Sequence, residues 1–224
     1  MLQRIDPIQM DQLREVVNIG VSHASTQLAN LLGRPVAIST PRISLCGVEQ
    51  DQVFTQRRDS LCAATLFVIT GDMPGFALLL LSEEAALLSV KILCHDTQDG
   101  LATLPDLERS SLTEMGNVVV GALLSAVSRF LNLSQLHSVP DMVCDMNDAV
   151  IHSVIAELMR DQEFYIASGV SFAIREEGSL ESPSLVGAGS GDLYLFLDPR
   201  GTGAVLEATK KILGGELVDV SLES

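Results

Sequence analysis

The chain has 224 residues, 47% of them hydrophobic, so it can bury a substantial core as one large domain or two small ones. Fourteen Lys and Arg against 29 Asp and Glu give a formal net charge of −15, which argues against binding to nucleic-acid phosphates or to anionic membrane surfaces. The four cysteines form no CxxC pair and have no close histidine, which favours reduced core thiols over a zinc site.

The chain also shows no targeting or membrane segment. Its first ten residues lack the long apolar core of a signal peptide, and the most apolar run, Gly75 to Leu81, is far too short to span a bilayer. We therefore expect a cytoplasmic protein.

The first half of the chain predicts the order helix, strands, helix. A long helix has Asp6 as its possible cap and Pro7 as its first residue, and Gly33 and Pro35 stop it. A second helix is opened by Ser82. The predicted elements are the first helix to residue 32, extended segments at 35–40 and 42–47, strands at 60–72 and 75–82 around the turn DMPG, and a helix at 82–95.

The second half begins at Pro105 and repeats this order with additions. It predicts a long helix at 106–132, a short helix at 147–161, strands at 163–176 and 191–198, and a last helix at 201–215. The polar, Ser- and Gly-rich stretch Gly178 to Gly191 is expected to be a hairpin loop.

The two halves match at an offset of 99 residues, which pairs Leu13 with Leu112 and Leu32 with Leu131. We expect an α+β fold: a pseudo-twofold duplicated unit with two long helices and further helices packed on a largely antiparallel β-sheet. Residues 1–224 would be a single domain made of two internal repeats, about 6–100 and 104–216.

The same offset repeats a polar pattern on the two long helices. Asp11, Glu15 and Asn18 lie within about 60° of one another on one helical stripe. A solvated helix face explains one Glu and one Asn, but packing gives no reason for both to recur in register. The pattern is Asp or Ser, three residues, Glu, two residues, Asn, 22 residues and Pro; its copies are Asp11, Glu15, Asn18, Pro41 and Ser110, Glu114, Asn117, Pro140.

This spacing resembles the CheC branch of the CheC/CheX/FliY family of chemotaxis phosphatases. The resemblance extends to NIG after the first Glu and to DMNDAVIHSVIAEL after the second motif. It implies hydrolysis of the aspartyl phosphate on a phosphorylated CheY-type response regulator. The implied roles are partner binding for Glu15 and Glu114, positioning of the attacking water for Asn18 and Asn117, support for Asp11 and Ser110, and structure for Pro41 and Pro140.

The implied chemistry suits these side chains. A loose phosphoryl-transfer transition state needs an aligned water and charge compensation, and a neutral amide that donates and accepts can align the water. We expect no metal ligands and no cofactor of its own, with magnesium bound by the partner receiver. The family also implies the deamidase CheD as a possible partner.

Two other functions stay open at this point. The chain could be a binding module that captures a phosphorylated receiver or CheD with little turnover, or a scaffold like those of the flagellar switch. Retention of both Glu and Asn pairs favours a free-standing phosphatase.

Three glycines lie inside the predicted long helices, where each costs about 1 kcal/mol relative to alanine. Gly20, Gly116 and Gly121 therefore predict close packing of other elements against the helices. For Gly20 the alternative is close approach of a partner's backbone to the first motif.

Overall fold

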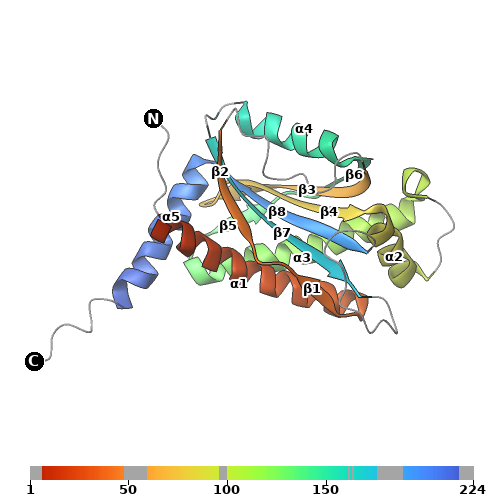
Figure 1. Cartoon of the computed structure of the whole chain (residues 1–224), viewed down its shortest axis with the longest axis horizontal. Helices are drawn as coiled ribbons and strands as arrows, with labels where there is room; N and C mark the ends of the chain where they lie inside the picture. Colours follow the sequence, from red (N-terminus) through yellow and green to blue (C-terminus); the bar gives the residue numbers. More distant parts are fainter. Residues whose placement is uncertain are drawn as a thin grey trace, which may run out of the picture.

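A computed structural model of the protein describes residues 7–47, 60–95, 100–160, 162, 164–175 and 189–216 (Figure 1). Its first half contains α1 (Pro7–Leu32), β1 (Val36–Ile38), β2 (Arg42–Gly47), β3 (Leu61–Gly71), β4 (Gly75–Ser82) and α2 (Glu83–Cys94). Its second half contains the short 3-10 helix η1 (Leu101–Thr103), α3 (Asp106–Leu131), β5 (Gln135–His137), β6 (Asp141–Met146), α4 (Asn147–Met159), β7 (Phe164–Ile174), β8 (Ser190–Leu197) and α5 (Pro199–Glu216).

The predicted elements are present, with three differences. The sequence pattern predicts neither the short strands β5 and β6 nor the 3-10 helix η1. The last helix begins at Pro199, two residues earlier than predicted, and β8 takes in the end of the predicted loop. The possible cap Asp6 and residues 178–188 of that loop lie outside the described residues.

Within the described part of the chain, the strands form one eight-stranded sheet in which every neighbouring pair is antiparallel. Its order is β1-β7-β8-β4-β3-β5, while β2 also pairs with β7 and β6 also pairs with β3. The two short strands of each half thus add to the long strand of the other half. The predicted α+β class with a largely antiparallel sheet is confirmed.

The exchanged strands pair in matching registers. Val36 lies opposite Ile174, and Gln135, which is 99 residues after Val36, lies opposite Gly71. Arg42 lies opposite Gly169, and Asp141 lies opposite Leu66. The same ladder therefore occurs twice, as a pseudo-twofold arrangement requires. The repeat boundaries, about 6–100 and 104–216, stay a prediction.

The helices cover the two faces of the sheet unequally. In Figure 1, α1 and α3 lie along one face with α2 and α5 at their ends, whereas α4 lies on the opposite face. The larger apolar core lies between α1, α3 and the sheet. A smaller core, which includes Tyr165, Tyr194 and Phe196, lies under α4. Because β7 and β8 are covered on both faces, nearly all of their residues are buried.

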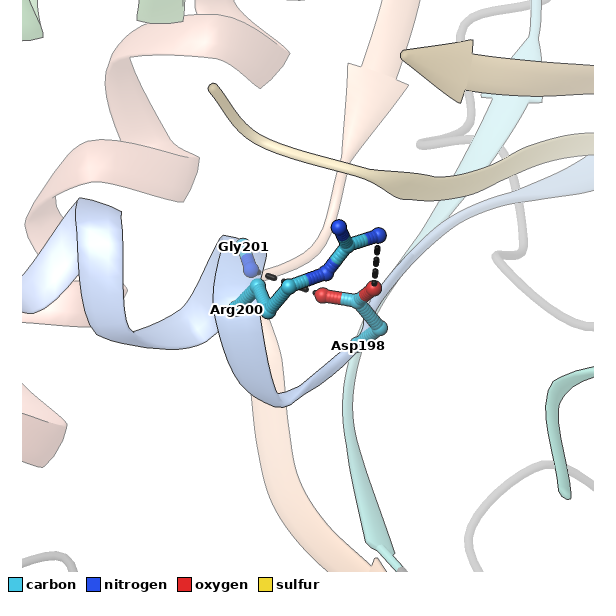
Figure 2. Close-up of polar contacts among 3 residues, drawn as sticks. All are labelled: Asp198, Arg200 and Gly201. Atoms are coloured by element: carbon cyan, nitrogen blue, oxygen red, sulfur yellow. Dashed lines mark hydrogen bonds and ion pairs between the residues drawn. The ribbon is translucent and has the colours of Figure 1, made fainter. Parts of the chain in front are cut away.

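α2 and α5 begin with equivalent side-chain caps. The Ser82 hydroxyl accepts a hydrogen bond from the Ala85 N–H (3.2 Å), which confirms Ser82 as the start of that helix. Figure 2 shows that one Asp198 oxygen accepts from the Gly201 N–H (2.7 Å) and the other from Arg200 (3.4 Å). Asp198 is nearly buried, so its carboxylate needs these donors.

Close packing explains two of the three glycines inside the long helices. A Cβ at Gly20 would lie 2.8 Å from the Val127 Cγ2, and one at Gly116 would lie 2.9 Å from the Thr65 Cγ2. The prediction was wrong for Gly121, where the nearest atom, the His137 Nε2, would be 3.8 Å away. Gly20 therefore sets how closely α1 approaches α3, and Gly116 sets the approach of α3 to the sheet.

Among the described helices, α3 alone is long and apolar enough to cross a membrane by length and composition. Half of the 18-residue window that meets this test is buried inside the protein. This is the pattern of a helix at the centre of a core.

The two glycine environments predict opposite effects of one substitution. Gly20→Ala should lower the free energy of unfolding by about 1–3 kcal/mol, because the methyl group forces α1 away from α3. Gly121→Ala, the matched control, should raise it by roughly 0.5–1 kcal/mol, because it adds helix propensity in ordinary contact space. Urea unfolding followed by circular dichroism measures both; a stabilised Gly20→Ala variant would contradict the close packing.

Candidate functional site

The two polar stripes lie on neighbouring helices that run in opposite directions. Leu13 of α1 and Val127 of α3 line one small cavity, while Leu28 and Val119 line another. With a rise of 1.5 Å per residue, this alignment separates the two motifs by roughly 15 Å along the helix pair. The arrangement therefore offers two separate sites.

The first site lies near the beginning of α1. Glu15 is exposed and Asn18 is half-buried, while Val16 and Val17 between them face the core. The exposed Asp11 accepts a hydrogen bond from Arg14 at 2.6 Å and forms an ion pair with it. Sequence reasoning missed Arg14, although its three-residue spacing from Asp11 is the signal of such a pair.

The second site repeats this exposure on α3. Glu114 is exposed and Asn117 is half-buried. The hydroxyl of the exposed Ser110 donates a hydrogen bond to the backbone carbonyl of Asp106 (2.8 Å). Within the described residues, Asp11 and Ser110 thus bond to their own helix turns, and neither has a hydrogen bond to the Glu or Asn of its stripe.

The two motif prolines lie at equivalent crossovers. Pro41 is buried between β1 and β2, and Pro140 is half-buried between β5 and β6. Each crossover is anchored by a serine two residues before the proline, which no part of the sequence analysis identified. The signal was the repeated Ser-x-Pro at the offset of 99 residues.

These serines make the same pair of hydrogen bonds. Ser39 donates its N–H to the Ser171 carbonyl (2.8 Å), and its hydroxyl accepts from the Ser171 N–H (3.0 Å). Ser138 donates to the Val68 carbonyl (2.9 Å) and accepts from the Val68 N–H (3.0 Å). The chain is thereby fixed just before each proline.

The second crossover runs beside the second stripe. Arg109 of α3 donates to the Met142 carbonyl (3.2 Å) and to the Cys144 sulfur (3.7 Å) on β6. Three turns later, Gly121 faces His137 of β5. Glu114 and Asn117 lie between these two contacts, so the segment around Pro140 passes alongside them.

The thiol beside Arg109 is not activated. Burial raises the pKa of Cys144, and the Arg109 guanidinium opposes this only in part. Burial likewise raises the pKa of Cys46, against a hydrogen bond with Tyr165. Cys46, Cys62, Cys94 and Cys144 form no disulfide with one another, and two of them are buried. No group of three or more His, Cys, Asp or Glu side chains within the described ranges could hold a metal ion.

The fold is shared with proteins of the bacterial chemotaxis and flagellar-switch systems. A crystal structure of Thermotoga maritima FliY matches 94% of this chain and 99% of its own, with a TM-score of 0.67 and 17% identity. The FliG–FliM complex of H. pylori contributes a chain that matches over 91% of this chain and 100% of its own, with a TM-score of 0.58 and 14% identity.

The sequence comparisons point to one branch of this group. Residues 8–45 match the model of the CheC-like family. The chain is 29% identical to the CheY-P phosphatase CheC of Bacillus subtilis over 165 residues, which are 73% of this chain and 79% of that protein. The resemblance to the CheC/CheX/FliY family that the motif spacing predicts is confirmed.

The serine anchors predict matched effects in the two halves. Ser39→Ala and Ser138→Ala should each lower the free energy of unfolding by about 0.5–1.5 kcal/mol, because each removes the acceptor of one backbone N–H. Ser125→Ala, an exposed position on α3, is the control and should stay within about 0.5 kcal/mol of the parent. Equal stability of all three variants in urea unfolding would show that the anchors contribute nothing.

Proposed function

We propose that the protein hydrolyses the aspartyl phosphate of a phosphorylated CheY-type response regulator. It would do so at two sites, Glu15 with Asn18 and Glu114 with Asn117. The observation that carries this proposal is the presence of the same Glu and Asn pair, outside the core, on both helices of the central pair. The similarity to a CheY-P phosphatase supports the proposal.

The reaction needs little from this chain beyond positioning. Water attacks the phosphorus, the bond to the receiver's aspartate oxygen breaks, and phosphate and a free carboxylate result. The amide of Asn18 or Asn117 orients the attacking water, because its carbonyl oxygen can accept a hydrogen bond from the water while its N–H donates one to a phosphoryl oxygen. No nucleophile on this chain is required.

Glu15 and Glu114 bind the receiver in this proposal. A receiver brings its magnesium ion, its phosphorylated aspartate and a lysine, and Glu15 or Glu114 pairs with that lysine and fixes the register. Glu at one position and Asn three residues later lie on neighbouring points of one helix face, so both can enter the same pocket.

The remaining motif residues support the two sites. Asp11 and Ser110 stand one turn before the glutamates, and Pro41 and Pro140 hold the crossovers beside the stripes. In this proposal the protein works in the cytoplasm, uses no cofactor of its own, and can bind CheD as a second partner.

The structural matches favour a second candidate function. FliY and FliM share this fold, and the matched FliM structure is a complex with FliG. A binding role, in which the chain captures a phosphorylated receiver or a switch component with little turnover, therefore competes with catalysis.

The two functions predict different behaviour of the asparagine variants. For the phosphatase, Asn18→Ala and Asn117→Ala should each reduce turnover at their own site by about tenfold to a thousandfold. Each single variant should keep the activity of the other site, and only the double variant should abolish it. The decay of a phosphorylated CheY-type receiver, followed with and without each protein, measures this.

The control is the free energy of unfolding, which should fall by no more than about 1 kcal/mol because Asn18 and Asn117 are half-buried and lie outside the core. If the parent protein binds the phosphorylated receiver without speeding its decay, the phosphatase proposal is wrong and the chain is a capture module. Complete loss of activity in one single variant would leave one working site in place of two.

A further inference from the structure

Two large apolar side chains are exposed to solvent on the helices that carry the candidate sites. Ile8 of α1 is 70% exposed and Leu107 of α3 is 74% exposed. Leu31 is the one other large apolar helix residue in the described ranges that is exposed, and only to 37%. A single exposed leucine is ordinary on a protein surface, so the exposure alone decides nothing.

Their position connects them to the motifs. Ile8 precedes Glu15 by seven residues, and Leu107 precedes Glu114 by seven residues. Seven residues complete two helical turns to within about 20°, so each apolar side chain lies on the stripe of its Glu, about 10 Å toward the helix start. The two residues are related by the same offset of 99 residues as the motifs.

The recurrence of an exposed apolar residue at the same place in both halves is evidence for a functional role, as is the recurrence of Glu and Asn. Packing inside the chain does not explain it, because both side chains point away from the core. We propose that Ile8 and Leu107 are the apolar part of two docking surfaces, each occupied by the receiver domain that presents its phosphorylated aspartate to the adjacent Glu and Asn. This inference rests on the proposed function.

The charge of this chain favours an apolar contact with the receiver. This chain has a formal net charge of −15, and the phosphorylated pocket of a receiver is itself rich in acidic groups. Long-range attraction therefore does not bring the two proteins together. Burial of Ile8 or Leu107 against the rim of that pocket supplies affinity that does not depend on charge.

The second surface differs from the first in the crossover that runs beside it. Val139, which directly precedes Pro140 in the crossover beside Glu114 and Asn117, is 89% exposed. The equivalent residue before Pro41 is Thr40. In this proposal Val139 adds one apolar side chain to the second surface, so the second site should bind the receiver more tightly than the first.

The test separates the two sites and uses a matched control. In the Asn18→Ala background, where the second site works alone, Leu107→Ser should raise KM for the phosphorylated receiver roughly fivefold to tenfold and leave kcat unchanged. Leu136→Ser removes a leucine that is 75% exposed on β5. Because His137 faces α3, Leu136 faces the other side of the sheet, and its loss should leave KM unchanged.

The first site is tested in the same way. In the Asn117→Ala background, Ile8→Ser should raise KM by a similar factor. The parent KM of this background should exceed that of the Asn18→Ala background, and Val139→Thr should remove most of the difference. Equal KM values for Leu107→Ser and Leu136→Ser, or an effect on kcat alone, would overturn the docking surfaces.

A binding measurement separates this inference from the proposed function. A CheY-type receiver loaded with beryllium fluoride mimics the phosphorylated state without being hydrolysed. If the parent binds it but does not speed the decay of the phosphorylated form, the phosphatase proposal fails while Leu107→Ser and Ile8→Ser still test docking. If sedimentation shows that these two substitutions dissociate a dimer of the chain, the surfaces are contacts between copies and the inference is wrong.

Discussion

The fold depends on one constraint: each half of the chain completes its sheet with strands from the other half. β1 and β2 pair with β7, and β5 and β6 pair with β3. Without these strands, each long strand β3 and β7 would expose a row of unpaired backbone groups at its edge. The crossovers that enter these exchanged strands are also the segments that hold the motif prolines. The strand pairing that joins the two halves therefore also places the segments that carry the motif prolines.

The packing of α1 and α3 leaves one polar stripe of each helix exposed to solvent. Gly20 allows α1 to approach α3 closely, and Gly116 allows α3 to approach the sheet. Once both helices are held this way, their apolar faces are covered and their polar stripes are left in water. The side chains proposed to act on the partner are thus placed by contacts on the opposite sides of the same helices. The rigidity that positions them comes from the core beneath.

The sequence predicted the long helices and their motifs because both signals are local. Apolar residues at helical spacing identify a helix, and the offset of 99 residues shows which polar residues recur. The short strands β5 and β6 were missed because three to six residues with mixed polarity give no clear period. Their pairing with β3 is set by tertiary contact. Likewise, the role of Ser39 and Ser138 is visible only once their distant partners, Ser171 and Val68, lie beside them.

Strand exchange has a consequence for how such a chain can arise. A single half of this protein, with its two short strands and its two longer ones, has a donor segment and a matching open edge. Two copies of that half satisfy each other's ladders by the same registers that the two halves use here. A homodimer of half-length chains and a single chain with two such halves are therefore alternative forms of one architecture. Within one chain, each half can differ in its surface from the other, as Thr40 and Val139 illustrate.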